Sequence, residues 1–472
     1  MREALIGLLL LAALPFRAGN RPLPLALLEC LGLILLASQQ RAAFRFLRAY
    51  PVMVLSAAAL LIVYPLIQLV PIPDGWWLAL PGRAPYAESF ALAGMAAATP
   101  ASGWHALTLD PALTEQGLLS VIPGLACALV VPAMDTRRIL RLLAWMAVLA
   151  TAEAALGVLE AAHVVETLGG WVEGQESVRT AAGTFANQDH FASFLAMSAL
   201  MSVGLALAFR RLATLERGRP PVRRSRPSDH AAHKASSDTQ NFWAGLCLLA
   251  ALLQCLTLPF TQSRAGVLSL AVGTLPLLAY ALLRAARSRR QQSWIAAATL
   301  TSLVLILFAA PSGLRERFSG AGVHPEVVQR TGLTLSSLRA AAAFFPFGTG
   351  LSTFPAVYPR FQPAEVTEFA NAAHDDYAQL VLECGAAGCI ALVLGLVAYA
   401  RRMWTLARDA APRSFTRLQF AAGVAMLAAL IHSAVDFPLR IPANAIWFSV
   451  LAGVLWHPGN SEESPSAQVT KA

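Results

Sequence analysis

The sequence predicts an all-α, polytopic integral membrane protein. Its 472 residues are 56% hydrophobic and only 13% charged, whereas soluble domains carry about a quarter charged residues. The mean hydropathy is +0.56, and apolar runs recur near the ~20 residues that a helix needs to cross a bilayer. One helix bundle can include the whole chain, so we expect a single transmembrane domain over residues 1–472.

Twelve apolar segments qualify as membrane-spanning helices. They are residues 4–16, 23–38, 51–70, 117–134, 139–162, 188–209, 242–260, 264–284, 293–311, 377–400, 416–435 and 441–457. The first two are short, and we interpret them as a closely spaced helical hairpin. The first also resembles a signal peptide, but no small-residue cleavage site follows it, so we expect it to be retained.

The distribution of positive charge predicts the orientation of these helices. With both termini on one side, the connections on that side contain 25 of the 36 lysine and arginine residues. Cytoplasmic connections are enriched in these residues, so we expect both termini in the cytoplasm. The net charge of +9 is then explained by the basic connections that orient the protein in the membrane. We expect no nucleic-acid partner.

The connections differ in character. Residues 210–241 are polar, basic and rich in proline and serine, which predicts a flexible cytoplasmic loop. On the other side, residues 71–116 carry tryptophans typical of a membrane interface, and residues 312–376 form a long periplasmic loop before the tenth span. The six cysteines lie in apolar segments without a CxxC pair. We therefore expect no metal and no cofactor.

Two arginines on the outer side are candidates for binding an anion. Arg264 lies in the tight turn TQSRAG between two spans, where an ionisable residue is a functional hypothesis and snorkelling to lipid headgroups is the alternative. Val327–Phe345 predicts an amphipathic interfacial helix that ends before Pro346. Within it, we favour Arg330, which shares a polar stripe, over Arg339 on the opposite side. Arg360 is a weaker candidate.

The sequence His374-Asp375-Asp376 stands directly before the tenth span. A neutral imidazole at that position can act as a general base, and nearby carboxylates raise its basicity. The alternative is that the three residues only cap the helix, where carboxylates suit the N-terminus. Metal binding is disfavoured, because three adjacent residues on a helix point in different directions.

A further polar cluster, HSAVDFPLRIPANA, follows the eleventh span. It contains His432 near the outer end of the span, and Asp436 and Arg440 in the short outer turn. We expect an internal Asp436–Arg440 ion pair, with Arg440 as possible support for a site. Several arginines and one base at a membrane surface suit an anionic, lipid-linked substrate, because guanidinium groups can neutralise a pyrophosphate leaving group.

Four motifs together resemble the O-antigen ligase and O-antigen polymerase superfamily. In order they are TQSRAG, RTGL, PFGTGLSTFPAVYP and AHDDYAQLVLECGAAG, and the resemblance covers about residues 250–400. The upstream stretch GTFANQDHFASFLAM is also similar to one often seen in these proteins. The family usually has asparagine after the histidine, whereas this chain has Asp375, which adds a negative charge beside the base.

The resemblance implies a GT-C-like, inverting, metal-independent glycosyltransferase of the bacterial inner membrane. Such enzymes move a glycan from an undecaprenyl-pyrophosphate carrier to a hydroxyl acceptor on the periplasmic side. Carried over to this chain, Arg264 and Arg330 would bind the pyrophosphate, and His374 would activate or orient the acceptor hydroxyl. Asp375 and Asp376 are possible support. The matching residues Glu383, Gly385 and Gly388 are interpreted as helix packing.

The acceptor and some alternatives stay open at this point. The acceptor could be a lipid A–core sugar (a ligase), the growing glycan (a polymerase), or a protein serine or threonine (an oligosaccharyltransferase). A transporter or flippase of a lipid-linked sugar is the alternative from another class. Transporters place charges near the bilayer midplane and often contain repeated halves, whereas here the charges collect on the outer side and no repeat is evident.

Overall fold

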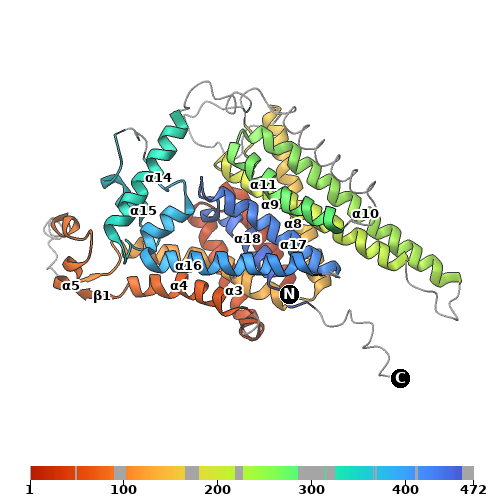
Figure 1. Ribbon diagram of the computed structural model, residues 1–472, viewed down its shortest axis with the longest axis horizontal. Helices are drawn as coiled ribbons and strands as arrows, with labels where there is room; N and C mark the ends of the chain where they lie inside the picture. Colours follow the sequence, from red (N-terminus) through yellow and green to blue (C-terminus); the bar gives the residue numbers. More distant parts are fainter. Residues whose placement is uncertain are drawn as a thin grey trace.

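The computed structural model describes residues 2–47, 50–89, 103–164, 180–217, 227–284, 314, 325–364, 366, 369–409 and 413–459. Helices dominate these residues, as predicted, and the described strands form one antiparallel pair (Figure 1). The pair joins β1 (Pro71–Pro73) to β2 (Trp104–Ala106). These strands lie between the third and fourth predicted spans, where we expected an interfacial loop.

Eleven of the long helices cover predicted spans, and α14 covers the predicted interfacial helix at 327–345. They are α1 (Arg2–Ala13), α3 (Pro22–Leu47), α4 (Val52–Gln68), α7 (Pro111–Val130), α8 (Thr136–Ala161), α9 (Gln188–Arg217), α10 (Pro227–Thr257), α11 (Arg264–Arg284), α14 (Pro325–Phe344), α16 (Asp376–Arg408), α17 (Ser414–His432) and α18 (Pro442–Leu455). Short helices join them: α2 (Pro15–Ala18), α5 (Asp74–Ala79), α15 (Phe354–Val357), η1 (Val131–Ala133), η2 (Leu258–Thr261), η3 (Tyr358–Arg360) and η4 (Pro438–Arg440).

Among the described residues, eight helices are long and apolar enough to cross a membrane. Of the predicted spans that are not among them, α4 and α18 are shorter apolar helices, and α1 has 12 residues. The segment predicted at 293–311 lies outside the described residues. The chain is therefore an all-α, multi-pass membrane protein, and twelve spans stay a prediction.

Helix α9 forms the centre of the bundle. In its most apolar window 89% of the residues are buried, and it packs against α8, α10, α11 and α17. Small residues allow these helices to approach closely. A Cβ added at Gly204 would lie 2.1 Å from the Cβ of Ala421 in α17, and one at Gly266 would lie 2.4 Å from that of Ala192.

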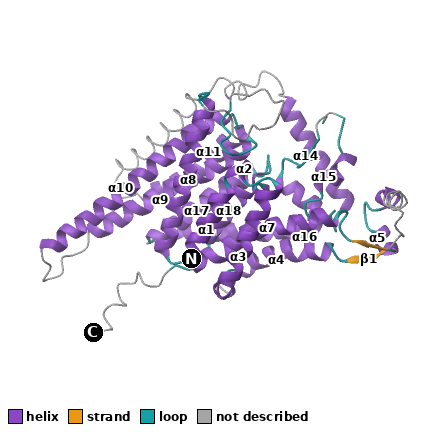
Figure 2. Cartoon of the chain, turned by 180° about the vertical axis from the view of Figure 1, so that it is seen from behind, coloured by secondary structure: helices purple, strands orange, loops and turns teal. Residues whose placement is uncertain are grey.

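Most of the segment predicted as a flexible loop, residues 210–241, is helical in the structure. Helix α9 continues to Arg217 and α10 begins at Pro227, so only residues 218–226 between them lie outside the described part. The two helices lie side by side and extend beyond the rest of the bundle (Figures 1 and 2). An ion pair of 3.0 Å between Arg217 and Asp238 joins them, so packing between the helices overrides the polar composition.

A second apolar cluster lies at the opposite end of the molecule, where α14, α15 and α5 gather (Figure 2). Its centre contains Trp77 and Phe344, and both rings contact the fully buried Arg83. The guanidinium of Arg83 donates to the carbonyls of Leu107 and Gly348 at 2.6 and 2.8 Å. It thus connects the segment that contains β1 and β2 to the glycine-rich turn that follows α14.

Helix α16 is interrupted where that turn packs against it. Gly385 has φ +55° and ψ −135°, and a Cβ there would lie 2.1 Å from the carbonyl oxygen of Pro346. The glycine of the Glu383-x-Gly385 motif thus reflects close approach of two backbones, which only glycine allows. This agrees with its interpretation as helix packing.

We predict that Gly385→Ala lowers the thermal unfolding temperature of the detergent-solubilised protein. Both the φ angle and the clash oppose the added methyl group, and such positions cost roughly 1–3 kcal/mol each. The matched control is Gly395→Ala in the same helix, where a Cβ would meet nothing within 4 Å. Equal unfolding temperatures for the two variants would contradict this explanation of the interruption.

Candidate active site

The candidate site is built where the starts of α9, α11 and α16 meet the end of α17 and the turn before α18. His374 stands just before α16 in the left-handed conformation, with φ +50°. The amide of Ala373 donates to the side chain of Gln379 at 2.9 Å, and the amide of Asp376 donates to the carbonyl of Ser433 at 2.9 Å. These bonds on both sides of His374 fix a backbone conformation that is unfavourable for a residue with a Cβ.

Each residue of the predicted His-Asp-Asp cluster has a different partner. The Nδ1 atom of His374 lies 2.9 Å from Oδ1 of Asp436. Asp375 is the N-cap of α16 and accepts from the amides of Tyr377 and Ala378, both at 3.0 Å. Burial of Asp375 raises its pKa, against the effect of these two bonds. Capping therefore accounts for Asp375, whereas His374 turns toward a carboxylate in another segment.

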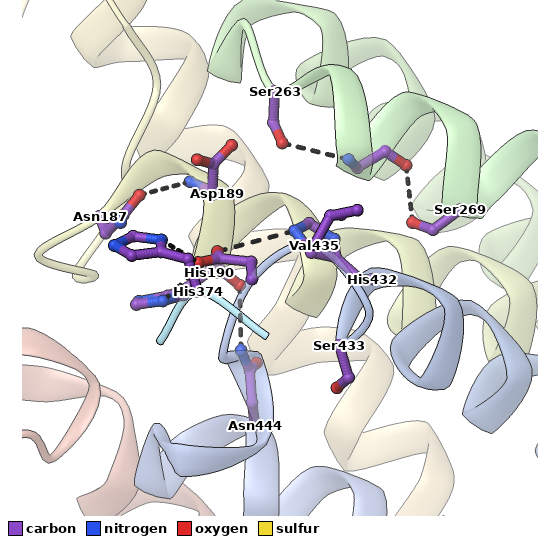
Figure 3. Close-up of polar contacts among 12 residues, drawn as sticks. Asn187, Asp189, His190, Ser263, Ser269, His374, His432, Ser433, Val435 and Asn444 are labelled. Carbon is purple, nitrogen blue, oxygen red and sulfur yellow. Dashed lines mark hydrogen bonds and ion pairs between the residues drawn. The ribbon is translucent and has the colours of Figure 1, made fainter. Parts of the chain in front are cut away.

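Asp436 is the central carboxylate of the site and is fully buried. Besides His374, it faces Nε2 of His190 at 3.5 Å and Nε2 of His432 at 3.8 Å. Burial alone raises the pKa of Asp436, but His190, the hydrogen bond with His374, and His432 outweigh burial and hold the pKa well below its ordinary value. Asp436 is thus an anion surrounded by three imidazoles (Figure 3 shows the three histidines).

The predicted Asp436–Arg440 ion pair is wrong, because each residue has other partners. Arg440 lies 2.9 Å from Glu383 and 3.5 Å from Asp376. Burial alone lowers the pKa of Arg440, but the carboxylates of Glu383 and Asp376 raise it above its ordinary value. Arg440 thus binds two carboxylates in the first two turns of α16, the helix that begins directly after His374 and Asp375.

Arg330 and Ser263, the residue before Arg264, both contact Asp189 at the start of α9. The Nη2 atom of Arg330 lies 2.5 Å from Oδ2 of Asp189, and its Nη1 donates to the carbonyl of Val435 at 3.5 Å. The side chain of Ser263, next to Arg264, also bonds to Asp189. Arg264 itself is half-buried as the first residue of α11. Both predicted arginines therefore lie at the end of the bundle that contains His374.

Arg360, the weaker candidate, has a different environment. It lies in η3, with its guanidinium 5.8 Å from the centre of the Tyr86 ring. This contact belongs to the second apolar cluster with Phe344, which Tyr86 also contacts. The contacts of Arg360 therefore do not connect it to His374 or Asp436.

Two carboxylates of α8 fix the loop that precedes α9. Glu160 accepts from the amides of Ala182 and Gly183 at 2.9 and 2.7 Å, and Glu153 accepts from both the amide and the hydroxyl of Thr184 at 3.0 Å. These hydrogen bonds hold the residues before α9 inside the bundle, and so position Asp189 and His190 at the site.

Within the described residues, no group of three or more His, Cys, Asp or Glu side chains has a geometry suited to a metal ion.

A comparison with known protein families finds one match. Residues 249–393 match the family described as O-antigen ligase. This segment forms an O-antigen ligase domain. It contains Arg264, Arg330 and His374, in agreement with the resemblance that the motifs indicated. A comparison with curated proteins finds no match.

The O-antigen ligase domain supports a membrane function of the O-antigen ligase or polymerase type. It suggests a glycosyltransferase-like enzyme whose partners are, in general, a lipid-linked glycan and an acceptor. Part of the site lies outside the matched segment. Asp189 and His190 precede it, and Asp436 and Arg440 follow it. The site of this O-antigen ligase domain therefore depends on helices from the rest of the bundle.

Sequence reasoning missed the roles of Asp189, His190 and Asp436. The stretch GTFANQDHFASFLAM contained a signal for the first two, because an Asp-His pair at the start of an otherwise apolar span is costly without a partner. Asp436 was seen but assigned to Arg440, since residues four apart in sequence are natural neighbours. The turn at Pro438–Arg440 is a short 3₁₀ helix instead, which separates their side chains.

The low pKa of Asp436 predicts how stability depends on pH. A carboxyl group whose pKa is lower in the folded than in the unfolded chain contributes stability above its unfolded pKa of about 3.9, and loses it as pH falls through the folded value. We expect the unfolding temperature of the native protein to exceed that of Asp436→Asn at about pH 6. The difference should shrink on acidification below about pH 4. A difference independent of pH would contradict the assignment.

Proposed function

We propose that this protein is a metal-independent, inverting glycosyltransferase of the bacterial inner membrane. It moves a glycan from an undecaprenyl-pyrophosphate carrier to a hydroxyl acceptor on the periplasmic side, with both termini in the cytoplasm. The observation that carries the proposal is the pairing of the half-exposed His374 with the buried Asp436, beside the Arg330–Asp189 pair. The O-antigen ligase domain supports the same reaction class.

The chemistry follows from these contacts. With Nδ1–H of His374 donated to Asp436, the Nε2 atom is free of its proton and can accept the proton of the acceptor hydroxyl. The hydroxyl oxygen forms a bond to the anomeric carbon as the bond from that carbon to the pyrophosphate oxygen breaks. Arg264 and Arg330 neutralise the charge that develops on the leaving pyrophosphate. A single displacement of this kind inverts the anomeric configuration.

Arg330 is paired before the donor arrives, which has a consequence for binding. Its guanidinium has five N–H donors, and its two terminal nitrogen atoms contact Asp189 and the carbonyl of Val435. Asp189 fixes the side chain in position, so less conformational entropy is lost when the donor binds. A surface polysaccharide ligase or polymerase needs such a site for every transfer, whichever hydroxyl it uses.

The test is a transfer assay with purified protein. Undecaprenyl-pyrophosphoryl glycan is incubated with separate acceptors: lipid A–core, free glycan and a serine- or threonine-containing protein. We expect transfer to one acceptor, resistance to chelator, and loss of transfer in Arg264→Ala and Arg330→Ala. The matched control is Arg339→Ala, an exposed arginine of the same helix as Arg330, which should transfer like the native protein.

Three outcomes would overturn parts of the proposal. Unchanged transfer in the Arg264 and Arg330 variants would exclude them as the pyrophosphate site. Chelator-sensitive transfer would indicate a metal. Movement of the lipid-linked glycan across vesicles without transfer to any acceptor would favour a flippase.

A further inference from the structure

One carboxylate oxygen of Asp436 has no hydrogen-bond partner, although the residue is fully buried. Its Oδ1 atom bonds to His374, whereas its Oδ2 atom is buried without a hydrogen bond, and so are Nε2 of His190 and both ring nitrogens of His432. His190 and His432 are 4% and 0% exposed. Buried polar groups are normally hydrogen-bonded, and unsatisfied ones destabilise the folded state. Two buried imidazoles beside one carboxylate therefore indicate a role other than stabilising the fold.

His190 is the better placed of the two. Its Nε2 atom lies 3.5 Å from Oδ2 of Asp436, against 3.8 Å for His432, so a shift of a few tenths of an ångström gives it a hydrogen bond. The backbone of His190 is fixed, because its carbonyl accepts from Nδ2 of Asn444 at 3.0 Å (Figure 3). The Phe437 ring packs edge-on against both His190 and His374, at 4.5 and 4.8 Å between ring centres.

We infer that His190 is a positioning residue for the transfer reaction, acting on His374 through Asp436. This inference rests on the proposed function. The imidazole of His190 donates its Nε2–H to Oδ2 of Asp436, which fixes the carboxylate in the orientation that accepts Nδ1–H of His374. That bond in turn selects the His374 tautomer whose Nε2 atom can accept the proton of the acceptor hydroxyl.

His190 moves no proton in this scheme. When His374 accepts the hydroxyl proton and becomes an imidazolium, its Nδ1–H stays on Oδ1 of Asp436, and the bond from His190 stays on Oδ2. Phe437, between the two imidazoles, excludes water that would otherwise compete for the carboxylate. The neighbour of His190, Asp189, binds Arg330. One Asp-His pair at the start of α9 therefore positions both the base and an arginine proposed to bind the leaving group.

The charged and titratable groups around Asp436 come from every element that packs against it. They are Asp189 and His190 from α9, Arg330 from α14, His374 and Asp376 at the start of α16, and His432 from α17. Loss of the His190 bond makes Asp436 a stronger acceptor, which favours proton uptake at this carboxylate and the groups it contacts. Activity should then fall at a higher pH as the solution is acidified.

The test compares His190→Gln with His190→Phe, and measures kcat, donor KM and the pH profile of kcat. Glutamine retains an N–H donor, so His190→Gln should stay within a few-fold of the native kcat. In His190→Phe, we expect a fall in kcat of about 10–100-fold, little change in donor KM, and an acid limb shifted to higher pH. In an Asp436→Asn background, His190→Phe should have no further effect on kcat.

The control for a lost buried histidine is His457→Phe. His457 is 2% exposed, lies beyond the far end of α18, and bonds to the carbonyl of Met134 at 2.8 Å. It should change stability and leave the pH profile unchanged. Equal losses in His190→Gln and His190→Phe, or a native pH profile in His190→Phe, would overturn the positioning role. Absence of transfer in the native protein would instead contradict the proposed function itself.

Discussion

Replacing His374 should nearly abolish glycan transfer while the donor still binds. A general base contributes typically 10²–10⁴-fold to a rate, and the ring of His374 is both held by a buried carboxylate and partly exposed. The proposed donor ligands, Arg264 and Arg330, lie on other elements. We therefore expect kcat to fall by about 10²–10⁴-fold and the donor KM to change little.

The choice of replacement matters because His374 has φ +50°. Asparagine tolerates the left-handed conformation better than most residues, so His374→Asn separates loss of the base from strain in the backbone. His374→Ala is the second variant. Equal unfolding temperatures with a lost kcat in His374→Asn would support catalysis by the imidazole. Transfer within a few-fold of the native rate in both variants would exclude His374 as the base.

Removing Glu383 should have the largest effect on stability. Its side chain is fully buried and lies 2.9 Å from Arg440, whose side chain is 26% exposed. It also accepts from Nε2 of Gln379 at 2.8 Å. Breaking a buried ion pair by removing one partner costs roughly 3–5 kcal/mol, and here Asp376, 3.5 Å from Arg440, compensates the remaining charge only in part. We expect Glu383→Ala to lower the unfolding temperature far more than Gly395→Ala does.

A double variant separates the pair from the packing around it. Glu383→Met combined with Arg440→Met replaces the pair by apolar side chains, and such replacements are often neutral or stabilising. We expect the double variant to recover most of the stability lost in Glu383→Met alone, as measured by thermal unfolding in detergent. Recovery of activity should lag behind, because Gln379 connects Glu383 to the amide of Ala373, directly before His374. Additive losses would contradict the importance of the pair.

The sequence predicted much of the helical framework because apolar length and charge asymmetry are local signals. Helix α16 begins at Asp376, one residue before the predicted start at 377, since Asp375 supplies its cap. Helix α9 extends beyond the predicted end at 209, because its packing against α10 is a tertiary effect with no local signal. The β1–β2 pair escaped prediction for the same reason, since its three-residue strands are specified by their partner.

The site was predictable only in part, and the reason is geometric. Arg264, Arg330 and His374 are charged or ionisable residues beside apolar spans. Their positions in the sequence were therefore enough to select them as candidate site residues. Their partners could not be inferred in this way. Asp189 is 141 residues from Arg330 along the chain, and Asp436 is 62 residues from His374. The bundle decides these pairings, and a nearby residue of opposite charge, such as Arg440, is then a misleading choice.

The most direct test of the central claim is a structure of the protein bound to undecaprenyl pyrophosphate in a lipid nanodisc. The proposed mechanism predicts the diphosphate within hydrogen-bond distance of both Arg264 and Arg330, with the sugar-bearing oxygen on the side where Nε2 of His374 is accessible. A diphosphate bound elsewhere, with the Arg330–Asp189 pair closed and His374 turned away from the headgroup, would contradict it.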